Sequence, residues 1–254
     1  MKWALLFLST TLFALPVGNP SDPALYSRGL YTCDCCLHIR LSYYGDFAYL
    51  KNMEEVIDGV RQGDAMQMRL VTNAGKLTFD INNWIDFYLI LGVANAASIR
   101  NGFFVEEDDY FPSHCWSVGG ALTLWEHRCF AFGIEGQYFR MPGAYNSTLN
   151  LLTGSYTYFN RNNHATWTEW QGGVGASYIF HDIASFELVP YIGIKATGGK
   201  LSLGEAMGLP HFKTNLLWGY AVGMSAAMSK LCGLTAEGRW GDESALYISG
   251  QVSF

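Results

Sequence analysis

The chain ends on Ser244-Ala245-Leu246-Tyr247-Ile248-Ser249-Gly250-Gln251-Val252-Ser253-Phe254, a stretch in which two kinds of side chain alternate. Because the side chains of a strand point to opposite faces in turn, the apolar residues and the glycine from Leu246 to Phe254 share one face. Small or polar residues and one tyrosine occupy the other face. This pattern, with a terminal aromatic residue, is typical of the closing strand of a membrane β-barrel. A half-buried strand of a soluble sandwich alternates in the same way.

The beginning of the chain carries the features of an export signal. Lys2 supplies a positive start, an apolar stretch follows from Trp3 to Phe13, and Ala14 offers a small residue for cleavage. The apolar stretch is shorter than the roughly 20 residues that a membrane-spanning helix needs, so it predicts a removable signal peptide over residues 1–14. We then expect a cysteine-containing periplasmic segment over residues 15–37 and a barrel over residues 38–254.

Strand-like alternation recurs along the rest of the chain, with turn residues between the stretches. Apolar residues take alternate positions in Ile39–Phe47, Leu77–Ile81, Ile85–Val93, Trp116–Leu124, Phe130–Tyr138, Trp170–Phe180, Leu188–Ile194, Phe212–Met228 and Leu234–Trp240. Together with the final stretch, this pattern predicts about ten strands. Twelve strands are the alternative, because Met66–Val71 and Tyr156–Phe159 have the composition to extend hairpins.

The connections between these stretches are sorted by length. Residues 51–74, 98–113, 141–163 and 198–211 form long connections, whereas residues 82–84, 126–128, 181–185 and 230–233 form short ones. The two kinds alternate, except that residues 241–244 are short where a long connection is due. Membrane barrels have short periplasmic turns and longer extracellular loops, and a sandwich has no reason for such sorting. We therefore predict an all-β fold, a transmembrane antiparallel β-barrel of the outer membrane whose last strand closes against Ile39–Phe47.

The composition fits a membrane barrel and argues against other classes. Hydrophobic residues make up 50% of the chain and charged residues 15%, against about 25% charged residues in ordinary soluble domains. The net charge of −6 leaves no basic footprint for a nucleic-acid backbone, so nucleic acid is not an expected partner. Tryptophans near the strand ends are expected to form the aromatic girdles of the barrel: Trp84, Trp116, Trp125, Trp167 and Trp240.

Several stretches, in order along the chain, carry a family resemblance. They are Leu15-Pro16-Val17-Gly18-Asn19-Pro20-Ser21-Asp22-Pro23, Tyr43-Tyr44-Gly45-Asp46-Phe47, Trp116-Ser117-Val118-Gly119-Gly120-Ala121, Leu124-Trp125-Glu126, Glu169-Trp170-Gln171 and Pro190-Tyr191-Ile192-Gly193-Ile194-Lys195. The first resembles the mature start of the chlamydial major outer membrane protein, a porin family. The second resembles that family's first strand, and the third and fourth resemble its central hairpin. The chain is much shorter than the family's members, through lost strands and shortened variable loops.

The resemblance implies an outer-membrane barrel that passes small solutes by passive diffusion and supports the envelope. It also implies contact with outer-membrane lipid, a trimer or other homo-oligomer, and disulfide bonds to other envelope proteins. A non-conducting structural or adhesive barrel is the alternative. A barrel hydrolase that uses His164 or His114 at the extracellular rim is a further one, but we predict no enzymatic activity and no cofactor.

Six cysteines are available for disulfide bonds in the oxidising compartment that an exported chain enters. Five of them are expected at the periplasmic rim, namely Cys33, Cys35, Cys36, Cys129 and Cys232. Cys115 falls near an extracellular strand end. Bonds within the chain, bonds to other envelope proteins and free thiols all stay open, because six cysteines allow 15 pairings. Neither a redox site nor a zinc site is predicted, since the βαβ context and the paired histidine spacing are missing.

Charged side chains on the inner face of the predicted strands are the candidate functional residues. They are Arg40, Asp46, Lys76, Asp80, Asp86, Glu135, Glu169, Lys195, Lys213, Glu237 and Arg239. In a wide pore such charges tune ion selectivity. A barrel of about ten strands has a narrow interior that side chains tend to fill, so a paired network that plugs the lumen is the other interpretation.

Overall fold

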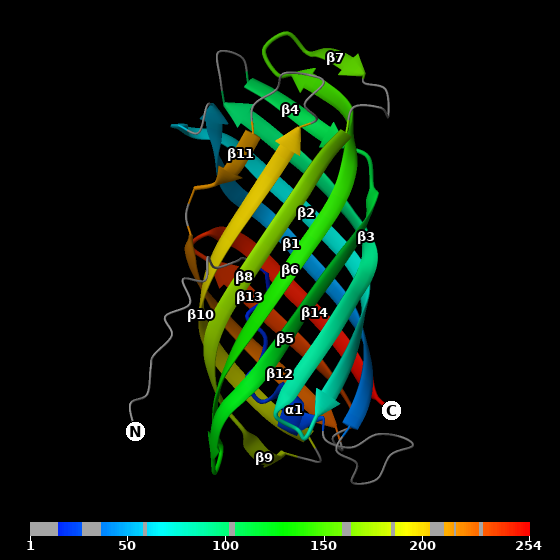
Figure 1. Cartoon of the computed structure of the whole chain (residues 1–254), viewed down its shortest axis with the longest axis vertical. Coiled ribbons are helices and arrows are strands. Elements are labelled where there is room, and N and C mark those ends of the chain that lie inside the picture. Colours follow the sequence, from blue (N-terminus) through cyan, green and yellow to red (C-terminus); the bar gives the residue numbers. More distant parts are fainter. Residues whose placement is uncertain are drawn as a thin grey trace, which may run out of the picture.

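The computed structural model describes residues 15–26, 37–57, 60–101, 105–158, 164–183, 186–203, 211–215, 217–228 and 231–254. One antiparallel sheet closes on itself into a tall barrel (Figure 1), and ten strands form the closed ring. These strands are β1 (Leu37–Ile57), β2 (Val60–Ile81), β3 (Ile85–Asn101), β5 (Ser113–His127), β6 (Phe130–Asn150), β8 (His164–Tyr178), β10 (Phe186–Leu203), β12 (Trp218–Met228), β13 (Cys232–Trp240) and β14 (Glu243–Ser253). The prediction of about ten strands is confirmed.

Five short elements complete the described structure. They are α1 (Asp22–Leu25), β4 (Val105–Tyr110), β7 (Ser155–Tyr158), β9 (Phe180–Ile183) and β11 (His211–Thr214). In Figure 1, β4, β7 and β11 lie at one end of the barrel, and α1, β9 and the C terminus lie at the other. None of the helices in these residues is long and apolar enough to cross a bilayer.

The barrel closes where the last strand pairs with the first. The β1–β14 register runs from Arg40 opposite Ser253 to Lys51 opposite Glu243. Beyond it, the Phe254 backbone N–H donates to the Ile39 carbonyl oxygen at 2.8 Å. Lipid offers no partner for an open strand edge, so this pairing is the condition for a sheet to cross a membrane. The closing strand expected from the sequence is confirmed.

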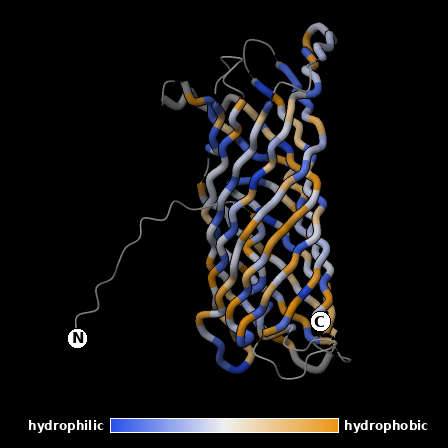
Figure 2. The backbone as a smooth tube through the Cα atoms, turned by 45° about the vertical axis from the view of Figure 1, so that its right-hand side comes forward, coloured by the Kyte–Doolittle hydropathy of each residue, from blue (hydrophilic) through white to orange (hydrophobic). Residues whose placement is uncertain are grey.

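The outer surface is apolar in the half of the barrel that holds the C terminus. Figure 2 shows hydrophobic positions concentrated in that half and more hydrophilic positions toward the opposite end. Outward side chains there include Leu91, 58% exposed, and Ile192, 61% exposed. Such exposure is costly in water and favourable against lipid tails. Short turns join the strands at this end, with Asn82 and Asn83 in left-handed conformation at φ 57° and 58°.

At the other end, the connections predicted as long loops are largely extended strands. β1 continues to Ile57 and β2 begins at Val60, and these two residues pair directly. The alternation continues into this region, with Met53 and Met66 buried opposite each other. Met66–Val71 therefore extends β2, and β7 adds a short strand on β6. Neither makes a twelve-stranded barrel.

The barrel narrows toward the end with the extended strands. The β13–β14 hairpin stops at the turn of residues 241 and 242, below the tops of its neighbours. Above it, β11 pairs with β10 on one side and with β1 on the other. The ring there consists of eight strands: β1, β2, β3, β4, β6, β8, β10 and β11. The connection over residues 241–244 is therefore short where a long one is due, and β11 fills the gap above it between β10 and β1.

Removing Phe254 should impair assembly of the barrel, because it removes the last hydrogen bond of the β1–β14 seam and its outward aromatic side chain. We expect a smaller fraction of heat-modifiable, folded protein in outer-membrane preparations. Phe254→Tyr, which keeps the backbone donor and an aromatic ring, is the control. Membrane insertion of the deletion variant at the level of the unaltered chain would contradict this account.

Candidate functional site

The lumen holds nearly all of the charged residues predicted for it. The structure places every predicted lumen-facing charge except Lys213 on the inner face of the barrel. Lys76 and Glu135 are half-buried there. The others are buried: Arg40, Asp46, Asp80, Asp86, Glu169, Lys195, Glu237 and Arg239.

Lys213 lies on the outer surface, so its assignment to the lumen was wrong. The sequence suggests one strand from Phe212 to Met228, but the structure breaks it at Asn215 into β11 and β12. In β12 the even-numbered residues face outward, whereas in β11 the even-numbered Phe212 and Thr214 are buried. A slip of one residue reverses every side chain of a strand, and this slip turns Lys213 outward.

The middle of the lumen contains a connected ion network. Lys195 Nζ lies 2.6 Å from Glu243 Oε1 and 3.1 Å from Asp242 Oδ2. Glu243 also pairs with Arg239 at 3.1 Å and with Lys51 at 3.2 Å. These groups link β1, β10 and β13 to the β13–β14 turn and β14. Burial of such charges is tolerated because each lies beside at least one charge of opposite sign.

Two further contacts extend this network, from Arg239 to Asp46 and from Lys51 to Glu169. Lys51, Asp242 and Glu243 were missed by the sequence prediction. Lys51 lies in a stretch predicted as a loop, and the two acids lie at a turn. The turn folds into the lumen, where the Cβ of any residue replacing Gly219 would lie 1.9 Å from Asp242 Oδ1.

Residues 15–26 run inside the lower half of the barrel, below this network. The sequence predicts a periplasmic segment over residues 15–37, and the described part of it occupies the lumen instead. Glu237 accepts the backbone N–H groups of Val17 and Gly18 at 3.0 and 3.1 Å. Thr123 Oγ1 donates to the Pro20 carbonyl oxygen at 2.8 Å. The polar backbone of this inner segment is thus paired with inward side chains of the barrel, as burial requires.

Glycines on the barrel wall make room for the inner segment. A Cβ at Gly193 would lie 2.4 Å from Val17 Cγ1, and one at Gly175 would lie 2.9 Å from Pro20 Cγ. Gly233 faces Tyr26 in the same way, with a Cβ 2.3 Å from its hydroxyl oxygen. The wall therefore forms a track that fits this segment and would exclude it if side chains were added.

The inner segment ends at the C-terminal end of the barrel with α1. Arg40 donates to the Asp22 carbonyl oxygen at 3.0 Å, pairs with Asp86, and lies 5.5 Å from the ring centre of Tyr26. Burial raises the pKa of the Asp22 carboxyl to about 6, and the Arg40 charge opposes this rise. Below about pH 6 the buried Asp22 carboxyl is mostly protonated and neutral, so packing of α1 inside the barrel is less unfavourable there than at higher pH.

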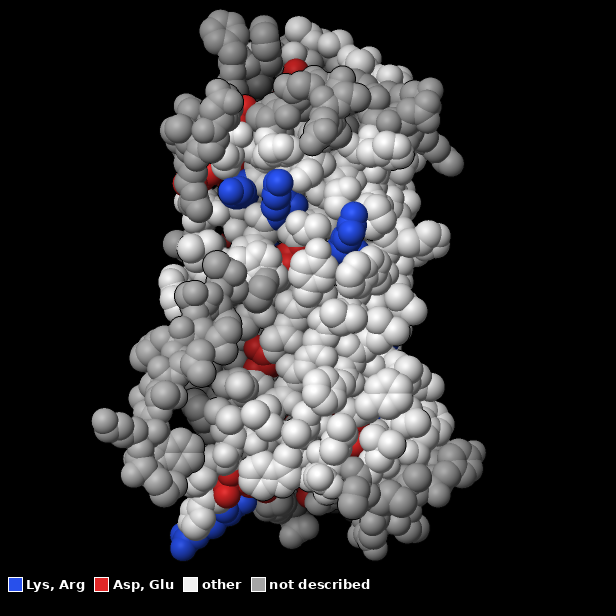
Figure 3. Space-filling view, in the orientation of Figure 1, with Lys and Arg blue, Asp and Glu red and all other residues white. Residues whose placement is uncertain are grey.

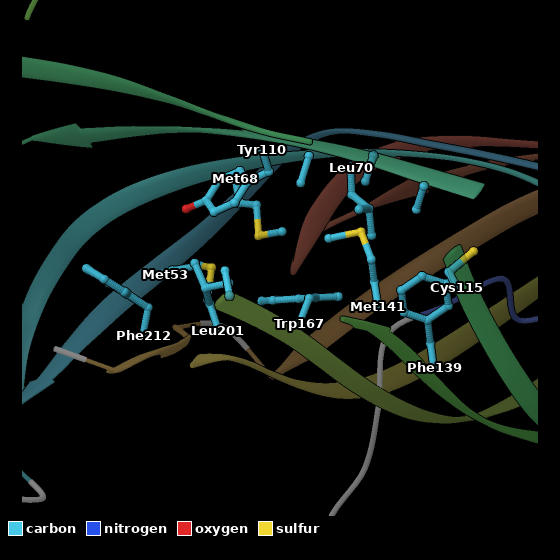
Figure 4. Packing of buried hydrophobic residues seen from close by; sticks show 14 of the residues in the cluster. Met53, Met68, Leu70, Tyr110, Cys115, Phe139, Met141, Trp167, Leu201 and Phe212 are labelled. Carbon is cyan, nitrogen blue, oxygen red and sulfur yellow. The ribbon is translucent and has the colours of Figure 1, made fainter. Parts of the chain in front are cut away.

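An apolar layer fills the upper half of the lumen. Figure 4 shows Trp167 between Met53, Leu201 and Met141, which come from different strands. Trp167 is fully buried, and its indole N–H donates to Glu169 Oε2 at 2.9 Å. Leu15, at the start of the inner segment, belongs to the same cluster. The inner segment thus joins the apolar layer at Leu15, while its later residues lie lower in the lumen.

Trp167 was predicted for an aromatic girdle, and the structure corrects this. It shares the inward face of β8 with Glu169 and Gln171, so strand periodicity directs it inward. The other predicted girdle residues, Trp84, Trp116, Trp125 and Trp240, are exposed on the outer side.

The cavity described between the inner segment and the wall is small. A cavity of about 20 Å³ lies among Gly18, Lys76, Tyr88 and Glu135. One water molecule needs about 10–15 Å³, so this space suits single waters rather than a stream of solutes. Within the described residues, no group of His, Cys, Asp and Glu is arranged to hold a metal ion.

The cysteines are distributed over both ends of the barrel. Cys115 is buried in the apolar layer, so its thiol is out of reach of another envelope protein. Cys129 and Cys232 are half-buried near the turns at the C-terminal end and form no disulfide with any described residue. Cys33, Cys35 and Cys36 lie outside the described residues.

Replacing Gly193 with Ala should displace the inner segment, because the added methyl group overlaps Val17. Overpacking of this kind costs on the order of 1–3 kcal/mol. We expect backbone amides of residues 15–26 to exchange hydrogen faster while the strands keep their protection. Gly136→Ala is the matched control, since its nearest contact would be an ordinary 3.7 Å. Unchanged exchange in residues 15–26 of the Gly193 variant would overturn the steric argument.

Comparison with known proteins connects this barrel to porins. A major outer membrane porin of Chlamydia pneumoniae is 24% identical over 381 aligned positions, which cover 96% of this chain and 95% of that protein. A major outer membrane porin of Chlamydia psittaci is 25% identical, covering 76% of this chain and 73% of that protein. The first alignment is longer than this chain of 254 residues, so the relative carries insertions. No protein-family model matches the chain.

Solved barrels are also similar, at low sequence identity. The β domain of the Bordetella autotransporter BrkA is 10% identical, with a TM-score of 0.49, covering 87% of this chain and 100% of that one. The outer membrane protease OmpT of Escherichia coli is 12% identical, with a TM-score of 0.44, covering 85% and 97%. The fold assignment rests on the strand pairing of this chain rather than on these scores.

The closed strand ring, the apolar outer belt and the sequence similarity along nearly the whole chain agree with one another. The chain is a porin-like outer-membrane β-barrel, and its sequence is similar to the chlamydial major outer membrane porins along nearly its whole length.

Proposed function

We propose that this porin-like barrel holds its lumen closed at two levels, and that small solutes diffuse through it only when both are displaced. The observation that carries the proposal is the position of Trp167, which is fully buried inside the narrower ring above the ion network. In the closed state the barrel supports the envelope without conducting.

The lower barrier is the inner segment. It is held by hydrogen bonds to Glu237 and Thr123 and by its fit to the glycine track. Each such hydrogen bond contributes on the order of 1 kcal/mol, somewhat more where the acceptor is charged. Contacts of this strength keep a segment seated and still allow it to leave.

The upper barrier is the apolar layer. Barrels of about eight strands have an interior that side chains can fill, and the ring closed by β11 belongs to this size class. The glycine at position 199 leaves room for the Trp167 ring, since a Cβ there would lie 2.5 Å from the indole. Apolar side chains at this position offer no hydrogen bonds to a hydrated solute, so the layer opposes passage by dewetting.

We propose no catalytic role for the chain. The hydrolase alternative needs His114 or His164 beside acidic groups at the rim. His114 is exposed on the outer face of β5, opposite Val93, and His164 is exposed at the start of β8. Loss of an unsuspected hydrolase activity on substitution of His164, with the barrel intact, would contradict this part of the proposal.

Disulfide-linked partners stay a proposal for the cysteines at the C-terminal end. Cys129 and Cys232 are partly accessible there, which supports contacts with other proteins of the periplasmic side. Mass-spectrometric mapping of disulfides from intact envelopes tests it. A mapping in which both thiols are free would show that Cys129 and Cys232 form no disulfide bond to another envelope protein.

Conductance in planar bilayers tests the two-level closure. The unaltered protein, a variant without residues 15–26 and the Trp167→Ala variant should each insert and remain electrically silent, because one barrier is left in each. The variant that combines both changes should show stepwise conductance. Trp125→Ala, which removes an exposed tryptophan of the outer face, is the matched control. Heat-modifiability of each variant shows that the barrel has formed.

Two results would refute the proposal. Steady conductance of the unaltered protein would show that the lumen is open. Silence of the combined variant, when it is folded, would show that the barrel does not pass solutes at all and serves the envelope structurally.

A further inference from the structure

A row of basic side chains crosses the outer surface above the apolar belt. Arg140 of β6 lies opposite Thr168 of β8, Thr168 lies opposite Lys200 of β10, and Lys200 lies opposite Lys213 of β11. Residues paired across strands share a face, and all three basic side chains are exposed. In Figure 3, basic side chains gather in a band across the upper part of this face, over a surface that is mostly uncharged with a few acidic side chains showing.

The arrangement of this row is unfavourable in the absence of an anion. Like charges directly opposite each other destabilise a sheet, and Lys200 faces Lys213 in this way. None of the ion pairs among the described residues includes Arg140, Lys200 or Lys213. The row ends at Glu54 of β1, which is opposite Lys213 on one side and Asp64 of β2 on the other. Neighbouring strands are about 4.8 Å apart, so one phosphate can contact two of these side chains.

The row lies at the upper edge of the membrane-facing surface. Trp116, 37% exposed, pairs directly with Arg140. The basic row therefore lies at the same height on the barrel as this tryptophan of the aromatic girdle. Trp170 lies two residues below Thr168, and its ring covers Gly198, where a Cβ would be 2.5 Å from Trp170 Cζ2. Tryptophans of this kind mark the interface between hydrocarbon and headgroups, so the basic row lies at headgroup level. This is the end with the long connections, which faces the outside in such barrels.

An apolar groove lies on the same strands below the row. It has a volume of about 350 Å³ and is lined by Phe132, Val174, Ile192, Ile194, Tyr220 and Val222 together with glycines and alanines. The small side chain of Ala176 stands between Phe132 and Ile192 in the cross-strand register, which hollows the surface there. Ile194 is six residues from Lys200 along β10, or about 20 Å along a strand. At a strand tilt of about 40°, this corresponds to roughly 15 Å of depth, half of the hydrocarbon core.

We propose that this face is a binding site for one phosphorylated lipid of the outer leaflet. The basic row of Arg140, Lys200 and Lys213 binds the phosphate groups. The groove over Ala176 takes the end of an acyl chain. The site is independent of the lumen and of whether it conducts, and it needs only that the barrel spans the outer membrane.

Lipid exchange into the refolded barrel tests the site, with bisphosphorylated lipid A and fully dephosphorylated lipid A of the same acyl chains as probes. Native mass spectrometry measures how much of each is retained. The unaltered protein should retain the phosphorylated form preferentially. A basic residue at an anionic surface is worth about 1 kcal/mol, so each charge removed should weaken retention about five-fold. Arg140→Gln, Lys200→Gln and Lys213→Gln together should abolish the preference between the probes.

Two more variants separate the parts of the site. Ala176→Phe fills the groove and should lower retention of both probes alike without changing the preference. Arg69→Gln is the matched control, because Arg69 is exposed on the outer face but shares its cross-strand row with the acidic Asp109. Heat-modifiability confirms that each barrel is folded.

Three outcomes would overturn the proposal. The first is an unchanged preference for phosphorylated lipid in the folded triple variant. The second is an equal loss on Arg69→Gln, which would indicate general charge attraction. The third is displacement of lipid by millimolar inorganic phosphate, which would indicate a site for free phosphate without an acyl chain.

Discussion

The structure depends on one seam, the antiparallel pairing of β1 with β14. In a bilayer, a backbone N–H or carbonyl group without a partner costs several kcal/mol, so a sheet can cross only when its edges meet. Once the seam is formed, the ring size fixes the width of the lumen. Everything placed inside must fit that width, and everything outside must suit lipid or headgroups. The alternating pattern of the final strand meets both demands residue by residue.

The interior then divides into layers with different physical roles. The ion network in the middle joins strands that are distant in sequence, such as β1 with β8 and β10 with β14. Its charges are tolerated because each acid has a basic neighbour, and losing one partner would leave a buried charge unpaired. The apolar layer above needs no such pairing and excludes water. The inner segment below fills a track that only glycines leave open. Contacts of three different kinds thus fill the lumen at successive levels.

Strand periodicity and connection lengths were sufficient to predict the fold class, the strand number and the closing strand. The same periodicity placed charges such as Lys195 and Glu237 correctly, because neither strand is interrupted near them. It failed at Lys213, where an unseen break at Asn215 reverses the faces, and it missed Lys51 in a strand extension taken for a loop. The position of residues 15–26 depends on contacts with Glu237, which are distant in sequence, and no local pattern announces them. Trp167 lies two residues before Glu169, so strand periodicity alone could have assigned it to the inner face of the barrel.

The narrowing by β11 gives the two halves of the barrel separate closures. The lower ring is sealed by β1 and β14, while the upper ring is sealed by β11 between β10 and β1 and does not involve β14. Separation of β1 from β14 would therefore leave the upper ring shut. It would join the interior sideways to the hydrocarbon of the bilayer and not to the medium outside the cell. Opening of the β1–β14 seam alone would thus create a lateral path between the lumen and the lipid.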